Sequence, residues 1–148
     1  MIGNKQSTEA AGLGARNWVL ETRRNTSPLY DKLDVFKKAY DLSLAIHKRS
    51  LSFPKFEQYE LASQLRRSSK SICANVGEEM SRQASSKDVV HFLRTAIGSC
   101  DETRIWLKYA VDLGYIEAEE YERFHEGYCE VGKMLTGLVK RWSVKSSL

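Results

Sequence analysis

Proline is nearly absent from this chain of 148 residues, which contains only Pro28 and Pro54 and has none from residue 55 to residue 148. Proline breaks helices because it lacks an amide hydrogen and clashes with the preceding turn, so its absence permits long helices. No apolar run approaches the length of a transmembrane span, and the first residues lack the apolar core of a signal peptide. We therefore expect one all-helical domain, located in the cytoplasm.

Residues that commonly bind metals are few and scattered. The three cysteines are Cys73, Cys100 and Cys129, and the three histidines are His47, His91 and His125. No two cysteines form a CxxC pair, and an odd number of distant cysteines favours buried free thiols. No histidine belongs to an HExxH motif or to a Glu-x-x-His pair of the di-iron type. The sequence therefore predicts no metal site and no cofactor.

Catalytic motifs are also missing. The chain has no GxSxG elbow and no glycine-rich phosphate loop, and no strand-to-helix junction is expected that could present a nucleophile. Two acidic pairs occur, Glu78-Glu79 and Asp101-Glu102, but we expect these carboxylates to be solvated or paired with arginines such as Arg82 and Arg104. We therefore predict no catalytic residue and a protein that is not an enzyme.

Apolar residues recur with helical spacing in four long segments. These are expected helices at about residues 33–51, 58–82, 86–113 and 117–142. Ser85 with Asp88 resembles a capping box at the third helix, and Gly114 suits the left-handed cap at its end. Short turns between long helices predict an antiparallel up-down-up-down four-helix bundle over residues 31–148. Residues 1–30 are small, polar and irregular, and we predict a flexible N-terminal arm there.

Two of the expected helices carry apolar residues on more than one face. In the first helix Tyr40 and Leu44 lie opposite Val35 and Ile46, which predicts burial on both sides. In the third helix a second apolar set lies opposite the core stripe: Ile105, Trp106 and Tyr109. An exposed patch of this kind is unusual for a monomer, so we predict that another subunit or the N-terminal arm covers it.

Positive charge is concentrated in the first part of the chain. The net charge is +4, and residues 1–30, 31–57 and 58–87 each carry +2, whereas residues 88–115 and 116–148 each carry −1. In the second helix Leu61, Leu65, Ile72 and Val76 form the core stripe, and Arg66, Lys70 and Arg67 lie at about 100°, 140° and 200° from Leu65. The candidate phosphate-binding residues are Arg66, Arg67, Lys70, Arg82, Lys87, Lys37 and Lys38.

The basic residues have a simpler interpretation that stays open, because dispersed cations also serve as ordinary solubilising charges. A phosphate-binding surface requires clustered cations, and a ring of subunits would join modest patches into a belt. In the fourth helix, six acids in the first half precede Lys133, Lys140, Arg141 and Lys145 in the last turns. That order matches the helix macrodipole, which accounts for these charges without a function.

Five short motifs, in order along the chain, carry a family resemblance: FPKFEQYEL, QLRRSSKSI, AIGSCDE, DLGYI and EVGKMLTGL. From about Leu33 to Trp142 the chain resembles the four-helix-bundle proteins encoded in intervening sequences of bacterial 23S ribosomal RNA. Their relatives include the accessory variability determinant of diversity-generating retroelements. Gln64, Arg66 and Arg67 match the family's QIRR-type segment, and Asn75 matches the asparagine of its SNIAEG-type segment. This chain departs from the family at two places: Cys73 stands where the family commonly has proline, and residues 77–79 are Gly-Glu-Glu in place of Ala-Glu-Gly.

The resemblance implies a ring-shaped homopentamer of four-helix bundles without catalytic activity. In the retroelement branch it implies a basic ring that binds nucleic acid and associates with a reverse transcriptase. We therefore predict a non-enzymatic accessory protein that contacts RNA or DNA phosphates without reading sequence, because few exposed aromatic residues are available for stacking. The alternative is a structural scaffold that holds a reverse transcriptase or another protein, with nucleic acid bound mainly by that partner.

Overall fold

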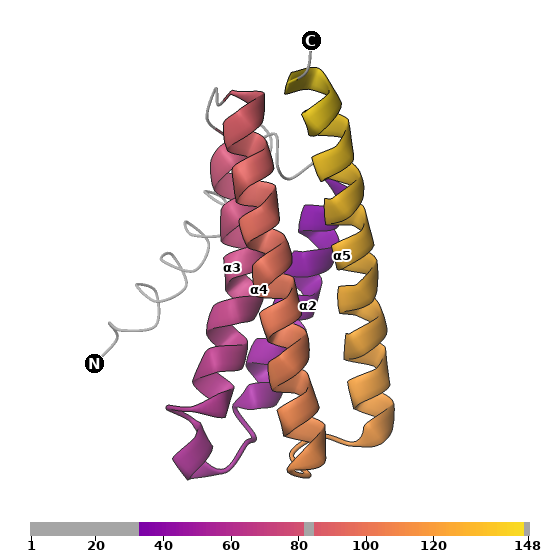
Figure 1. Cartoon of the computed structure of the whole chain (residues 1–148). Coiled ribbons are helices and arrows are strands. Elements are labelled where there is room, and N and C mark those ends of the chain that lie inside the picture. The colour runs from indigo at the N-terminus through magenta and orange to yellow at the C-terminus, as the bar shows by residue number, and fades with distance from the viewer. Residues whose placement is uncertain (1–32, 82–84, 147–148) are drawn as a thin grey trace, which may run out of the picture.

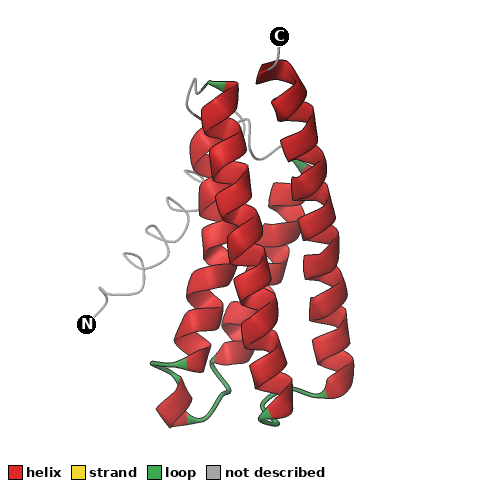
Figure 2. Cartoon of the chain, in the orientation of Figure 1, coloured by secondary structure: helices red, strands yellow, loops and turns green. Residues whose placement is uncertain are grey.

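In the part of the chain that the structure describes, four α-helices pack side by side along the bundle axis (Figures 1 and 2). The structure is a computed structural model that describes residues 33–81 and 85–146. The helices are α2 (Asp34–Ser50), α3 (Leu61–Ser81), α4 (Ser86–Asp112) and α5 (Ala118–Ser146), with a 3₁₀ turn η2 (Lys55–Glu57) between the first two. The described residues contain no strand. The all-helical four-helix bundle is thus confirmed, whereas the pentameric ring stays a prediction and the arm at residues 1–30 lies outside the described part.

Helix α3 begins three residues later than the apolar periodicity predicts, at Leu61 instead of Gln58. The reason is local, because the chain after Pro54 first forms the 3₁₀ turn η2. The Gln58 side-chain amide donates hydrogen bonds to the carbonyl oxygens of Ser50 at 2.9 Å and Phe53 at 3.0 Å. Carbonyls left free at the end of α2 are thereby satisfied, and the α2–α3 connection is held as a defined turn.

Both ends of α4 are capped as the sequence indicates. Ser85 Oγ accepts a hydrogen bond from the Asp88 amide at 3.2 Å and donates one to the Asp88 carboxylate at 2.6 Å. At the other end Gly114 has φ +80°, a conformation that costs glycine little. The amides of Gly114 and Tyr115 donate to the carbonyls of Val111 and Ala110, which is the Schellman arrangement.

The core lies along the axis and draws on all four helices. Its largest fully buried side chains include Ile46, Leu65, Ile72, Leu107, Tyr128 and Leu135. Small polar residues line the contact between α3 and α4, where Thr103 Oγ1 donates to Ser68 Oγ at 2.9 Å and Ser71 Oγ lies 2.9 Å from Ser99 Oγ. Small side chains let the two helices approach closely. No helix in the described part of the chain is long and apolar enough to cross a membrane.

One face of α2 is more exposed than the sequence predicts. Val35, Ala39 and Ile46 are buried in the core, but Tyr40 and Leu44 are 47% and 42% exposed. Burial of α2 on both sides is therefore wrong for a single chain. A helical wheel shows that a face is apolar, but it does not show whether the same chain supplies the helix that covers it.

Candidate functional site

Arg66, the first of the predicted phosphate-binding residues, is half-buried and hydrogen-bonded inside the protein. Its guanidinium donates to Ser50 Oγ at 2.9 Å, to the Gln58 carbonyl at 2.8 Å and to Gln58 Oε1 at 3.3 Å. These bonds tie α3 to the end of α2 and to the turn that follows it. Arg66 therefore has a structural role that its sequence position alone does not reveal.

Arg67 points to the opposite side of α3, towards α4. Its Nη2 lies 2.5 Å from Glu102 Oε1, and its Nε and Nη2 also donate to Gln64 Oε1 at 3.2 and 2.9 Å. Glu102 Oε1 accepts a further hydrogen bond from Trp106 Nε1 at 3.2 Å. Because Arg67 remains 60% exposed at its side chain, this ion pair ties two helices with only modest energy.

Lys70 lies beside a histidine of α2. Its Nζ is 3.0 Å from His47 Nδ1, and because an ammonium group can only donate, Nδ1 is the acceptor in this contact. Partial burial, followed by the charges of Lys70 and Arg66, lowers the pKa of His47 from its ordinary value of 6.5. His47 is thus held in its neutral form between two cations, and Lys70 is exposed at the rim of the α2–α3 contact.

The other predicted cations lie on different parts of the surface. Lys38 on α2 forms an ion pair with Glu130 on α5 at 2.5 Å, whereas the side chains of Lys37 and Lys87 are exposed and have no hydrogen bond or ion pair to another described residue. Arg82 lies outside the described residues. The structure therefore does not gather the six described candidates on one surface, and phosphate contact by each of the seven predicted residues stays a prediction.

The predicted oligomer interface divides into exposed and half-buried residues. Ile105 and Tyr109 on α4 are 55% and 54% exposed, as expected of an uncovered patch. Trp106 is half-buried and packs against the core, and its ring contacts that of Tyr109 in a tilted arrangement, with ring centroids 5.8 Å apart and planes at 41°. Contact of this patch with another subunit stays a prediction, and Tyr109 is the residue best placed to test it without disturbing the core.

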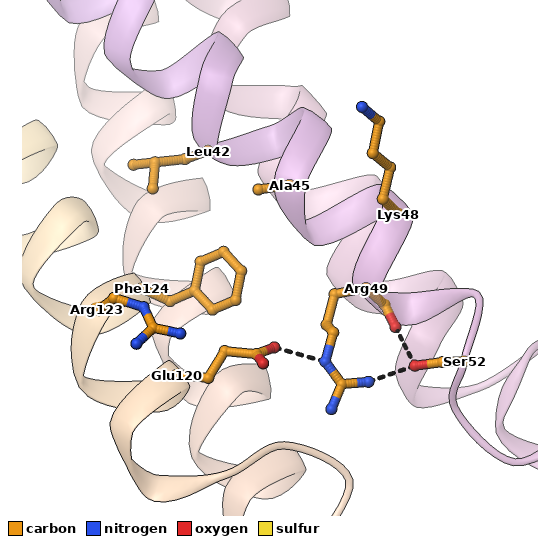
Figure 3. Close-up of a pocket in the computed structure, with 8 residues that line it drawn as sticks. All are labelled: Leu42, Ala45, Lys48, Arg49, Ser52, Glu120, Arg123 and Phe124. Atoms are coloured by element: carbon orange, nitrogen blue, oxygen red, sulfur yellow. Dashed lines mark hydrogen bonds and ion pairs between the residues drawn. The ribbon is translucent and has the colours of Figure 1, made fainter.

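A groove runs between α2 and α5 (Figure 3). One part of it has a volume of about 640 Å³, with Leu42, Ala45 and Phe124 as its apolar lining. Arg49 Nε lies 2.6 Å from Glu120 Oε1 and closes one end of this part, while Lys48 extends away from that ion pair (Figure 3). A second part of about 410 Å³ shares Leu42 and Ala45 and continues along the same two helices.

A cysteine and a histidine approach each other on α5. Cys129 Sγ lies 3.5 Å from His125 Nε2, one helical turn away, and His125 Nδ1 is buried without a hydrogen-bond partner in the described structure. Nucleophilic catalysis would also need donors for an oxyanion, but backbone amides in the middle of a helix are already bonded within it. Among the described residues no group of three or more His, Cys, Asp or Glu side chains could hold a metal.

Four exposed cations in the first half of α4 and the second half of α5 were not among the candidate residues chosen from the sequence. They are Arg94, Lys133, Lys140 and Arg141. None of their side chains forms an ion pair or hydrogen bond with another described residue. The helix macrodipole is a sufficient explanation for the three on α5 when that helix is considered alone. The signal that could have found them is the antiparallel order of the helices, which places the start of α4 beside the end of α5 (Figure 1).

Residues 31–137 match the family model described as 23S rRNA-intervening sequence protein. The chain is also similar to the crystal structure of a protein of unknown function from the S23 ribosomal protein family of Bacteroides thetaiotaomicron VPI-5482. The TM-score is 0.66 and the sequence identity 26%, over 72% of this chain and 95% of that one. No curated protein matches the chain.

Proposed function

The chain belongs to the 23S rRNA-intervening sequence protein family, and we propose on that premise that it is a non-enzymatic protein that binds the phosphates of RNA or DNA. The observation that carries the proposal is the set of exposed cations whose side chains have no partner among the described residues: Lys37, Lys48, Lys55, Lys87, Arg94, Arg123, Lys133, Lys140 and Arg141. Cations that stabilise a fold are usually paired, as Lys38 and Arg49 are here. Unpaired cations stay available for phosphate oxygens, and their binding releases counterions.

The proposed assembly is a ring of five copies that assists a reverse transcriptase. Support for an assembly comes from the apolar residues that a single chain leaves exposed, Ile105 and Tyr109 on α4 and Tyr40 and Leu44 on α2. Large exposed patches of this kind mark interaction surfaces in soluble proteins. The number of copies and the reverse transcriptase follow from the resemblance to the accessory variability determinant, and they are part of the proposal.

Light scattering and a binding titration on one sample test this function. The expected result is a mass near five times 16.9 kDa, together with binding of a labelled RNA at about 50 mM salt that weakens steeply as salt is added. A mass of one chain combined with no binding of RNA or DNA at that salt would contradict the proposal.

The second candidate function is a scaffold that holds another protein, with nucleic acid bound by that partner. The groove between α2 and α5 favours it, because Leu42, Ala45 and Phe124 offer an apolar lining between charged rims. Tyr109→Glu separates the two functions more cleanly than a change at Trp106, which packs against the core. If Tyr109→Glu loses both the oligomer and the binding of RNA, the result favours the ring. If RNA binding is weak in the wild type and unchanged in Tyr109→Glu, the result favours the scaffold.

A further inference from the structure

One contact fixes how α4 and α5 are aligned. Cys100 Sγ on α4 donates a hydrogen bond to the carbonyl oxygen of Tyr128 on α5 at 3.2 Å. The two helices run in opposite directions (Figure 1). Residues that precede Cys100 and residues that follow Tyr128 therefore extend towards the same end of the bundle.

Positive charge gathers at that end. We define the basic end as five exposed residues, two on α4 and three on α5: Lys87, Arg94, Lys133, Lys140 and Arg141. None of their five side chains has a hydrogen bond or ion pair to another described residue. The same stretches, 86–99 and 129–144, contain two carboxylates, Asp88 and Glu130, and Asp88 already accepts a hydrogen bond from Ser85 Oγ at 2.6 Å. Glu130 is occupied by Lys38 at 2.5 Å.

The five cations lie at two levels along the axis. With a rise of 1.5 Å per residue, Arg94 lies about 9 Å and Lys133 about 8 Å beyond the Cys100–Tyr128 contact. Lys87 lies about 20 Å beyond it, and Lys140 and Arg141 lie about 18 to 20 Å beyond it on the neighbouring helix. The cations of α4 are therefore matched in level by cations of α5, although the two sets are about 40 to 50 residues apart in sequence.

The other half of the α4–α5 pair has the opposite charge. Helix α5 begins with five glutamates and a single arginine over residues 118–130. The second half of α4 holds three acids, Asp101, Glu102 and Asp112, and two cations, Arg104 and Lys108, that form ion pairs with Asp101 and Asp112. The helix macrodipole favours acids at a helix start and cations at its end, which accounts for α5. It does not account for α4, where Lys87 and Arg94 lie in the N-terminal half. Helix stability alone therefore leaves the basic end unexplained.

We propose that the basic end is the surface that contacts the phosphodiester backbone of a nucleic acid, a location that rests on the proposed function. The exposed Phe and Tyr rings among the described residues are those of Tyr40, Phe56, Tyr59 and Tyr109, and none of them belongs to the stretches of α4 and α5 that form this end. His91 is exposed there, and its ring already lies edge-on to Phe92 with centroids 5.3 Å apart. Contacts at this end are therefore made by cations with phosphates, and binding is sequence-independent. Five phosphate contacts on a single strand correspond to a salt slope of about −3.5 in log–log form.

A pair of charge reversals with a matched control tests the location. The first variant carries Lys140→Glu and Arg141→Glu at the basic end. The control carries Lys55→Glu and Arg123→Glu, whose side chains are exposed towards the acidic end and have no hydrogen bond or ion pair to another described residue. Arg123 also lines the groove between α2 and α5. Both variants change the net charge equally. The probe is a fluorescein-labelled uridine 20-mer titrated against salt, with the helical content of each protein checked by circular dichroism.

The expected result is a loss of at least tenfold in affinity for the basic-end variant, with a salt slope shallower by about 1.4, because two phosphate contacts are removed. The control keeps the wild-type slope. Lys140→Gln with Arg141→Gln provides a second variant that keeps good helix formers, and it should flatten the slope equally. Equal losses in both reversals, or none in either, would overturn the location while leaving the function intact. No binding by the wild type would overturn the function and the location together.

Discussion

Arg67 on α3 and Trp106 on α4 share one acceptor, the Oε1 atom of Glu102, at 2.5 and 3.2 Å respectively. This carboxylate thus connects a residue predicted to bind phosphate with a residue predicted to lie in an oligomer interface. Both side chains donate hydrogen bonds to Glu102 of the same chain, so they are less available for phosphate binding or for assembly than surface residues without a partner. Exposed cations with unpaired side chains lie elsewhere, among them the five of the basic end.

Arg67→Ala should have a small effect on both stability and binding. The ion pair with Glu102 is largely exposed, and such pairs contribute about 0.2 to 1 kcal/mol to the free energy of unfolding. We expect a stability loss in that range by urea unfolding and an RNA affinity that falls less than in Lys140→Ala. An Arg67→Ala protein that loses more affinity than Lys140→Ala would place the contact on α3 instead.

His47 should make the stability of the protein depend on pH. Partial burial and the charges of Lys70 and Arg66 lower its pKa in the folded protein. The unfolded chain therefore binds the proton more readily than the folded protein. The contribution of neutral His47 to the free energy of unfolding is complete above about pH 6.5 and is lost as the pH falls towards the folded-state pKa. Between pH 7.5 and 5.5 the melting temperature of the wild type should fall more than that of His47→Gln. Parallel pH profiles of the two proteins would contradict this.

The thiol of Cys100 should be inert while the protein is folded. Its side chain is buried and donates to the Tyr128 carbonyl, and burial raises its pKa to about 11. At pH 8 only about one thiol in a thousand is then ionised, and the thiolate is the reactive form. In a protein with Cys73→Ser and Cys129→Ser, labelling of Cys100 by a disulfide reagent should be at least tenfold slower than in urea. Equal rates would show that the bundle opens readily at this level.

The Tyr128 hydroxyl is buried without a hydrogen-bond partner in the described structure. Burial raises the pKa of this phenol far above its usual range, so the group stays neutral. Because an unpaired buried hydroxyl is costly, Tyr128→Phe should raise the free energy of unfolding by about 1 kcal/mol. Urea unfolding measures the change, and Tyr128→Ala, which leaves a cavity, serves as the destabilised control. A loss of stability in Tyr128→Phe would reveal a partner for the hydroxyl.

The helices could be predicted from the sequence because their signals are local. Apolar spacing, the Ser85 cap and the break at Gly114 each act within a few residues, and the observed boundaries of α2 and α4 differ by one residue or less from those predicted. The start of α3 was less predictable, because Gln58 completes its turn by bonding to carbonyls five to eight residues earlier in the chain.

The candidate site was harder to predict because it depends on contacts between helices. Arg66 meets Ser50 and Arg67 meets Glu102, partners that lie 16 and 35 residues away. A helical wheel places both arginines on the polar side of α3 but does not show these partners. The basic end likewise appears only when α4 and α5 are aligned. Charge counts by segment assign the excess positive charge to residues 1–87, and for each later helix they give one net charge that hides the difference between its two halves.

In the proposed function the exposed, unpaired cations of this bundle bind phosphates, and the salt dependence of wild-type affinity for a uridine 20-mer is the direct test of that binding. Titrations from about 50 to 200 mM salt should give a straight log–log plot with a slope of about −3.5, the value for five contacts on a single strand. A slope near zero, or no measurable binding at the lowest salt, would contradict the claim and return these residues to the role of solubilising charges.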